Sequence, residues 1–189
     1  RLDHGRGLEV LIEAFARTVG RRDGWTLLLA GTGPATHQLR AQASRLGIGA
    51  RVCWLRTLRE EELPGLLAAS TLLVSPNLGG DVSGWRVRRA LACGLPVLAG
   101  RGSRSEEFVE HDGCGLLIDK QETASWEEAL TIATGSPERR RRWGLGARKR
   151  AEERYAWPAI VREFEGLLLS ELRERRPGAW EAGADVDPA

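Results

Sequence analysis

The chain is 189 residues long, with 42% hydrophobic and 29% charged residues, which indicates a soluble globular protein with one sizeable core or two small ones. A formal net charge of +2 at pH 7 gives no indication of a polyelectrolyte partner such as nucleic acid. The cysteines, Cys53, Cys93 and Cys114, lie far apart without metal-binding spacing, so we expect reduced, buried thiols and neither a disulfide framework nor a zinc site.

The first part of the chain alternates between helical and strand patterns. Apolar residues from Leu8 to Val19 recur at helical spacing, and Gly20 ends that helix. Short apolar runs rich in β-forming residues predict buried strands. Thr57-x-x-Glu60 is a candidate capping box. The predicted elements are a helix over 8–19, a strand over 25–30, a turn at Gly31-Thr32-Gly33-Pro34, a helix carrying Leu39, Ala43 and Leu46, a strand over 52–55 and a helix through Leu63, Leu66 and Leu67.

The stretch from Thr71 to Gly94 combines a strand, a glycine-rich loop and a helix. The apolar run at 71–75 predicts a buried parallel strand, which Pro76 ends because proline has no N–H to donate. Glycines in the loop allow a sharp turn, and apolar residues return at helical spacing after Gly84. Open α/β sheets bind ligands at such a junction, where the N–H groups of the helix point at an anion.

Two further strands and several helices complete the pattern. The strands are expected over 97–99 and 115–118, and the helices over 106–109, 125–132, 137–154 and 157–172. From Pro177 onward the sequence has no periodicity, which predicts disorder. Five strands alternating with helices predict an α/β fold with a doubly wound parallel sheet and additional helices at the C-terminal end.

The central stretch also resembles a known family. Asp81-Val82-Ser83-Gly84, followed by Arg89-Ala90-Leu91-Ala92-Cys93-Gly94-Leu95-Pro96-Val97-Leu98-Ala99, resembles the donor-site signature of retaining glycosyltransferases of the two-domain GT-B architecture. That signature contains two glutamates; here Asp81 replaces the first and Arg89 the second. Arg1-Leu2-Asp3-His4-Gly5-Arg6-Gly7 resembles the family's Arg-Leu-x-x-x-Lys-Gly segment.

This resemblance implies the Rossmann-like, donor-binding C-terminal domain of a GT-B enzyme. We expect the domain over residues 1–173 and a disordered tail over 174–189. The family's first strand, central in the order 3-2-1-4-5-6, directly precedes the segment that Arg1 begins, so this strand is expected to be missing. The absence of methionine fits a piece of a longer chain. Since an unpaired buried backbone group costs on the order of 1–3 kcal/mol, we expect the 189 residues alone to fold poorly.

The resemblance also assigns roles to individual residues. Arg1 and Arg6 match the basic pair on the donor's diphosphate, and Asp81 matches the carboxylate that approaches the transferred sugar, which makes it the expected catalytic residue. Glu107, with Glu106 as an alternative register, matches the acidic residue of a glycine-rich loop. The expected donor- and phosphate-binding residues are Arg1, Arg6, Gly31, Gly33, Ser83, Gly84, Arg89 and Glu107.

Arg89 has two interpretations. The family's glutamate accepts hydrogen bonds from both ribose hydroxyls, which a guanidinium cannot do. Losing two such bonds costs about 3–6 kcal/mol of donor binding. In the alternative, Arg89 and Arg86 on the same helix stripe hold phosphate or pair with Asp81. Outside the family context, Asp81 is a turn residue and Gly31-x-Gly33 a tight turn.

The resemblance implies transfer of a hexosyl group from a UDP- or GDP-sugar to an unknown acceptor, with retention, in glycan biosynthesis. The nucleotide sugar is the expected partner and donor substrate, and no metal or other cofactor is expected. An N-terminal acceptor-binding domain is the expected missing partner, and the 189 residues alone are expected to be inactive. The alternative is a degenerate, non-catalytic binding or assembly module.

The basic stretch at 139–150 is interpreted as a solvated helix face. Acidic residues flank it and no aromatic array accompanies it, so we expect no nucleic-acid partner. No apolar run approaches about 18 residues, so neither a transmembrane helix nor a signal peptide is predicted. We expect a cytoplasmic protein, with association at the inner membrane surface as an alternative.

Overall fold

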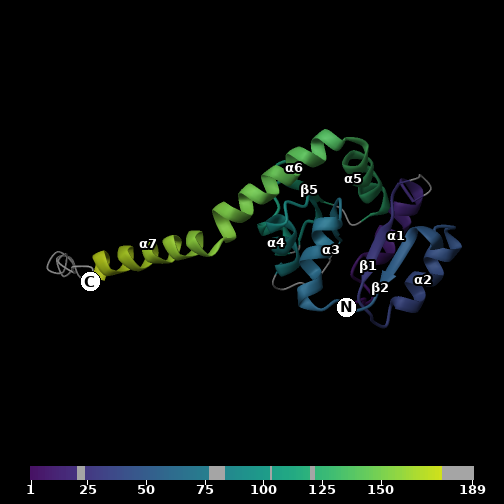
Figure 1. The fold of residues 1–189 in the computed structure, drawn as a ribbon, viewed down its shortest axis with the longest axis horizontal. Coiled ribbons are helices and arrows are strands. Elements are labelled where there is room, and N and C mark those ends of the chain that lie inside the picture. The colour runs from purple at the N-terminus through teal and green to yellow at the C-terminus, as the bar shows by residue number, and fades with distance from the viewer. Residues whose placement is uncertain (21–23, 77–83, 103, 120–121, 176–189) are drawn as a thin grey trace. The chain divides into compact units, whose positions relative to one another are not determined.

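The structure is a computed structural model that describes residues 1–20, 24–76, 84–102, 104–119 and 122–175. It divides into two compact units, Arg1–Arg150 and Ala151–Ala189 (Figure 1). The predicted domain boundary at 173 stays a prediction. Helix α7 runs on to Arg175, into the residues expected as a tail, and residues 176–189 lie outside the described part.

The first unit alternates strands and helices in the predicted order. Its strands are β1 (Leu27–Ala30), β2 (Val52–Leu55), β3 (Leu73–Ser75), β4 (Val97–Gly100) and β5 (Gly115–Ile118). Its helices are α1 (Leu8–Arg17), α2 (Thr36–Arg45), α3 (Leu63–Ala69), α4 (Trp85–Ala92), α5 (Thr123–Gly135) and α6 (Pro137–Arg150), with 3-10 turns η1 (Gly49–Arg51), η2 (Glu60–Glu62) and η3 (Arg104–Glu107). The five predicted strands and the α/β class are confirmed.

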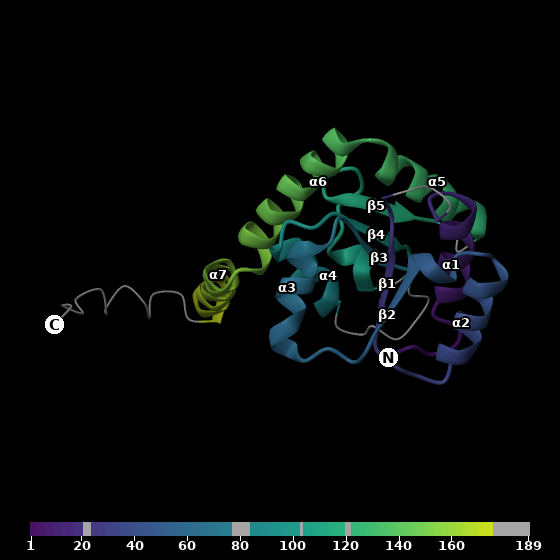
Figure 2. The same cartoon turned by 45° about the vertical axis from the view of Figure 1, so that its right-hand side comes forward.

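The strands form two separate parallel sheets (Figure 2). β1 pairs with β2 in the register Leu27↔Val52, and β4 lies between β3 and β5. No ladder joins β1 to β3 in the part of the chain that the structure describes. Parallel strands alternating with helices are the pattern of a doubly wound α/β fold.

Several local expectations are wrong. The predicted short helix at 106–109 is the 3-10 turn η3, and the predicted helix at 137–154 changes at Arg150 into a π-helical turn, η4 (Ala151–Tyr155). The capping box at Thr57 and Glu60 does not form, because the Glu62 carboxylate accepts the backbone N–H of Arg59 at 2.8 Å. Cys53 and Cys93 are exposed, since one lies on the outer strand β2 and the other just beyond α4; Cys114 alone of the three is buried.

The core lies between the sheets and the helices of the first unit. α1 packs against α2 and α5, and α4 packs against α6. Fully buried side chains include Ile12, Leu39, Leu98, Trp126 and Trp143. Burying a large apolar side chain contributes about 1.5–3 kcal/mol, so these residues fix where the strands end and hence where a site can form.

The second unit consists of η4 and α7 (Trp157–Arg175) in its described part. α7 exposes large apolar side chains, with Trp157 at 75% and Phe164 at 61% exposure. Within the described residues, no helix has both the length and the apolar character to cross a membrane.

Candidate functional site

A cavity of about 1230 Å³ lies in the first unit. Strands β1 and β3 line it along their whole length, with α1 on one flank and α3 on another. The turns that follow the strands, Gly31–Pro34 after β1, Thr57–Glu60 after β2 and Pro76 after β3, line it as well. Since the carboxyl ends of parallel strands share one edge, these turns gather at one end of the cavity, the usual place for a ligand in an open α/β sheet.

That end of the cavity is strongly basic. We call this end of the cavity the polar end. Its charged residues are Arg1, Arg6, Arg59, Glu60, Arg86 and Arg89. Among the lining residues that the structure describes, Glu60 supplies the single carboxylate against five guanidiniums. Such a group of cations suits a ligand with several negative charges.

Asp3 orients two of these arginines. Its Oδ1 lies 3.0 Å from Nε of Arg1, and its Oδ2 lies 3.1 Å from a terminal nitrogen of Arg6. The side chain of Arg6 is 24% exposed, whereas that of Arg1 is 74% exposed. Arg6 is therefore the more firmly held of the pair. The role of Asp3 was not predicted from the sequence. Its position between two arginines was the one signal that could have indicated it.

The turn after β1 brings Gly31 and Gly33 to the cavity. Gly31 has φ +117, a conformation that favours glycine, and a Cβ on Gly33 would lie 2.1 Å from the carbonyl oxygen of Leu2. The N–H of Leu2 donates to the carbonyl of Thr32 at 3.0 Å, and the N–H of Ala35 donates to that of Leu2 at 3.1 Å. The absence of a side chain at Gly33 thus allows the backbone of Leu2 to pack against this turn, which places Arg1 at the polar end.

Helix α4 brings its first and fifth residues to the polar end. Gly84 precedes it as the N-cap with φ 58, as predicted, but Gly84 itself does not line the described cavity. Arg89 lies 4.8 Å from the centre of the Trp85 ring and forms an ion pair with Glu60. Arg86 lines the cavity beside them. Glu60 and Trp85 were missed because neither belongs to the sequence signature.

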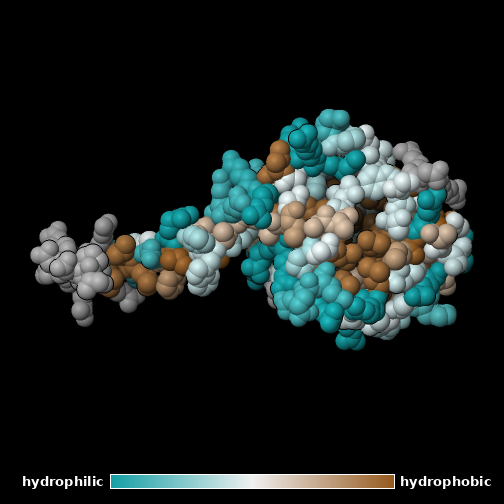
Figure 3. Space-filling view, viewed as in Figure 1, coloured by the Kyte–Doolittle hydropathy of each residue, from teal (hydrophilic) through white to brown (hydrophobic). Residues whose placement is uncertain are grey.

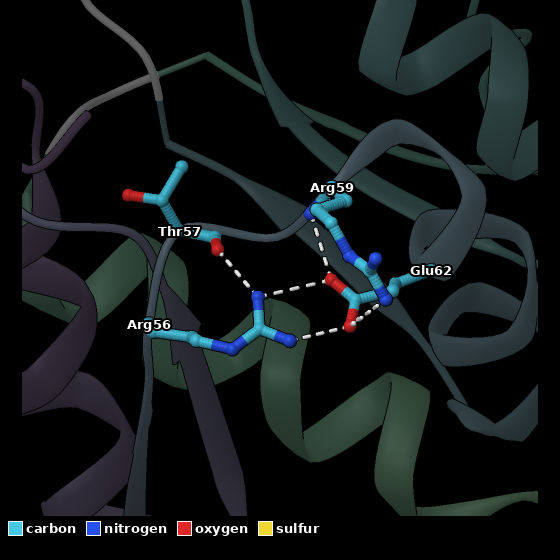
Figure 4. Close-up of polar contacts among 4 residues, drawn as sticks. All are labelled: Arg56, Thr57, Arg59 and Glu62. Carbon is cyan, nitrogen blue, oxygen red and sulfur yellow. Dashed lines mark hydrogen bonds and ion pairs between the residues drawn. The ribbon is translucent and has the colours of Figure 1, made fainter.

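A second carboxylate, Glu62, holds the loop after β2 in place (Figure 4). The Arg56 guanidinium donates to Glu62 at 3.0 Å and to the carbonyl of Thr57 at 2.8 Å. These bonds from Arg56, and then the backbone N–H of Arg59, lower the pKa of Glu62 from 4.5 to about 2. Arg56 faces this loop and does not line the described cavity, so it positions the segment that presents Glu60.

Of the remaining expected residues, two fall outside the described part of the chain and one does not line the described cavity. Asp81 and Ser83 lie outside the described residues. Glu107 lies on η3, 3.5 Å from Arg104, and does not line the described cavity. Its neighbour Glu106 accepts hydrogen bonds at 3.0 Å from Arg101 and from the backbone N–H of Gly102, which favours a loop-holding role. No group of three or more possible metal ligands occurs in the described ranges.

The basic stretch on α6 is engaged with the protein itself. Arg140 donates to the carbonyls of Ala133 and Thr134 near the end of α5, and Arg148 donates to the carbonyl of Ala92 at the end of α4. Arg142 pairs with Asp112 at 3.1 Å. Guanidiniums at helix C-termini satisfy the last carbonyls and oppose the helix dipole. These residues tie α6 to neighbouring elements.

Two parallel β-sheets flanked by helices, with an arginine-rich cavity beside the turns that follow β1, β2 and β3, are features of a Rossmann-like α/β domain. The chain belongs to the family described as Glycosyl transferases group 1, which it matches over residues 1–150. This confirms the resemblance seen in the sequence.

Known relatives agree with the family. The chain is 30% identical over 192 residues to the GDP-mannose-dependent alpha-(1-6)-phosphatidylinositol monomannoside mannosyltransferase of Mycolicibacterium smegmatis, covering 96% of this chain and 48% of that protein. It is 33% identical over 170 residues to the D-inositol 3-phosphate glycosyltransferase of Nocardia farcinica, covering 86% of this chain and 36% of that protein. The chain therefore spans about half, or less, of the length of these relatives.

Solved structures show the same architecture. Anabaena Alr3699/HepE in complex with UDP has a TM-score of 0.78 and 25% identity, covering 90% of this chain and 47% of that one. The C-terminal domain of the glycosyl transferase LpcC from Francisella tularensis has a TM-score of 0.75 and 17% identity, covering 83% of each chain. At that identity the likeness concerns the fold alone, which is that of a C-terminal GT-B domain.

Proposed function

We propose that the chain binds a nucleoside-diphosphate sugar and forms the donor half of a retaining hexosyltransferase. The observation that carries the proposal is the polar end: five guanidiniums and one carboxylate beside the turns that follow the parallel strands β1, β2 and β3. The UDP bound by HepE and the GDP-mannose dependence of the mycobacterial relative support a nucleotide sugar as the ligand. The acceptor-binding half is proposed to lie in a further domain, and the 189 residues alone are proposed to be inactive.

Arg6 and Arg86 are proposed to contact the diphosphate, with Arg1 beside them. As the bond between the anomeric carbon and the phosphate oxygen breaks, negative charge builds on the departing diphosphate. Guanidiniums that are already in place stabilise that charge more in the transition state than in the bound donor, so they accelerate the step. Asp3 acts as a positioning residue because it holds Arg1 and Arg6. Asp81 is proposed to contact the sugar, and the transfer is proposed to proceed without a metal.

The Glu60 carboxylate is proposed to accept hydrogen bonds from the ribose hydroxyls. Arg89 stands where the family signature has a glutamate, and a guanidinium accepts no hydrogen bond. The ion pair brings the carboxylate of Glu60 to Arg89, so an acceptor is present near the same position. Arg89 is then a positioning residue for Glu60. The second candidate function is a non-catalytic binding module. If Glu60 does not reach the ribose, the arginine at position 89 leaves no acceptor for the ribose hydroxyls and favours this second function.

Calorimetric titration of the protein with UDP-glucose, GDP-mannose, UDP and uridine tests the proposal. We expect the three ligands that contain a diphosphate to bind, and uridine to bind at least about tenfold more weakly than UDP, since the guanidiniums recognise phosphate. The Arg6→Met variant should lose this preference, whereas Arg45→Met, an exposed α2 position outside the cavity, should keep it. Equal binding of UDP and uridine would reject the proposal.

A further inference from the structure

The side chain of Trp85 meets two of the five guanidiniums at the polar end. Trp85 is the first residue of α4, lines the cavity and is 37% exposed. The guanidinium carbon of Arg86 lies 5.2 Å from the centre of the Trp85 ring, and that of Arg89 lies 4.8 Å from it. A cation within about 6 Å of the centre of an indole ring is attracted by the negative charge of the ring face. One ring therefore attracts both guanidiniums.

Arg86 and Arg89 repel each other. They lie three positions apart on α4, which makes their side chains neighbours on the helix surface, where like charges are unfavourable. Each arginine side chain also loses rotamer freedom when it becomes ordered. The ion pair with Glu60 holds Arg89. The ring of Trp85 contacts both arginines, so it opposes the repulsion between them.

The remainder of the cavity suits a guanidinium poorly. Mostly apolar side chains line it, and Figure 3 shows hydrophobic surface gathered between α3 and the β1–β2 pair. A guanidinium that turned toward this surface would lose water without meeting an anion, which is costly. Phe15 and Trp25 also line the cavity, but Phe15 belongs to the buried core, and Trp25 precedes β1 and so lies toward the amino end of that strand. Among the described lining residues, Trp85 is the aromatic residue at the polar end.

We propose that Trp85 is a positioning residue for the diphosphate: its ring holds the guanidiniums of Arg86 and Arg89 where the phosphates meet them. The inference rests on the proposed function, in which the polar end binds a nucleoside diphosphate. Because these guanidiniums are ordered before the ligand arrives, less ordering entropy is lost on binding. The buried residues Val87, Ala90 and Leu91 anchor α4, so the exposed ring is not needed to hold the helix in place.

Calorimetry with UDP and with uridine on the wild type, Trp85→Leu and Trp85→Phe tests the inference. Leucine keeps an apolar side chain without an aromatic face, whereas phenylalanine keeps such a face. We expect Trp85→Leu to lower the ratio of UDP to uridine affinity by roughly 3- to 10-fold, and Trp85→Phe to lower it less. The affinity for uridine should stay the same in all three proteins. Trp157→Leu, the same substitution at an exposed position on α7, is the matched control and should keep the wild-type ratio.

The outcomes distinguish this inference from the proposed function. Equal binding of UDP and uridine by the wild type would reject both. If the wild type prefers UDP and Trp85→Leu keeps the whole preference, the inference is overturned and the proposed function stands. If Trp85→Leu weakens UDP and uridine by the same factor, the ring contacts the nucleoside instead of positioning the guanidiniums, which also overturns the inference.

The aromatic face itself is tested by the comparison of the two variants. A loss in Trp85→Phe as large as that in Trp85→Leu would contradict the inference, because the aromatic ring would then not be the cause. Urea unfolding of each variant shows whether it folds. If Trp85→Leu does not unfold cooperatively, Trp85→Gln, which suits an exposed helix position, gives the same comparison with the same expected ratio.

Discussion

Arg89 on α4 and Glu60 on η2 form an ion pair at the polar end of the cavity, although 29 positions separate them in the sequence. This contact joins the arginine that departs from the family signature to the one carboxylate among the described lining residues. On the proposed function, Arg89 belongs to the donor site and positions Glu60.

The Arg89→Glu substitution is therefore expected to weaken binding of UDP or GDP. Two carboxylates would face each other, and a cation beside the diphosphate would be lost. Charge-assisted bonds of about 1.5–3 kcal/mol correspond to roughly 10- to 100-fold in affinity. Calorimetry with UDP measures this, and Arg88→Glu, on the same helix but outside the described lining, is the matched control. Tighter binding by the Arg89→Glu variant would mean that Arg89 is simply a damaged acidic position.

Glu60 is expected to determine how much the 2′-hydroxyl of the ribose contributes to the affinity for UDP. We expect wild-type protein to bind UDP more tightly than 2′-deoxy-UDP, by about 10-fold for one charge-assisted bond. Glu60→Gln should shrink this ratio, while Glu61→Gln, at the neighbouring position outside the cavity lining, should keep it. If Glu60→Gln leaves the ratio of UDP to 2′-deoxy-UDP affinity unchanged, Glu60 does not bind the ribose. The non-catalytic binding module would then be the favoured function.

Gly33→Ala is expected to destabilise the first unit. The new Cβ would lie 2.1 Å from the carbonyl oxygen of Leu2, a contact that forces the first residues away from the turn after β1. Losing the two backbone bonds of Leu2 costs about 1–3 kcal/mol. Gly65→Ala is the matched control, since its Cβ meets nothing within 4 Å in α3, and it should stabilise by about 0.5–1 kcal/mol. Urea unfolding of both variants tests this, and equal midpoints would contradict the close approach.

The loop after β2 should respond to acid through Glu62. The folded pKa of Glu62 is about 2 against an ordinary 4.5, so the unfolded chain binds more protons between these values. The stabilisation is therefore fully present above about pH 4.5 and is lost as the pH falls through about 2. Glu62→Gln should remove this pH dependence, whereas Glu61→Gln should leave it as in the wild type. A carbon-13 titration that gives Glu62 an ordinary pKa would contradict the contacts with Arg56 and Arg59.

The sequence predicts the strands well because each is a short apolar run that turns on both sides delimit. It also predicts the start of α4 after Gly84, where a left-handed residue begins the helix. The capping box was misplaced because Glu60 and Glu62 both suit such a role, and the choice depends on Arg56, whose side chain turns toward Glu62. The spacing of residues in the sequence does not show which glutamate the long Arg56 side chain reaches.

The candidate site was predictable in part. Arg1, Arg6 and Arg89 reach the same cavity, in keeping with their expected place, although their contacts to a donor stay a prediction. Glu60 and Trp85 could not be found, because their place in the site follows from tertiary contacts to Arg89. Glu107 was expected at the site because it aligns with the acidic residue of the family's glycine-rich loop. In the structure its neighbour Glu106 makes the contacts to Arg101 and Gly102.

The most direct test of the central claim is a crystal structure of the protein with UDP. We expect the diphosphate within hydrogen-bonding distance of Arg6 and Arg86, and the ribose beside Glu60. A well-ordered UDP bound elsewhere, with the polar end still filled by solvent, would contradict the account.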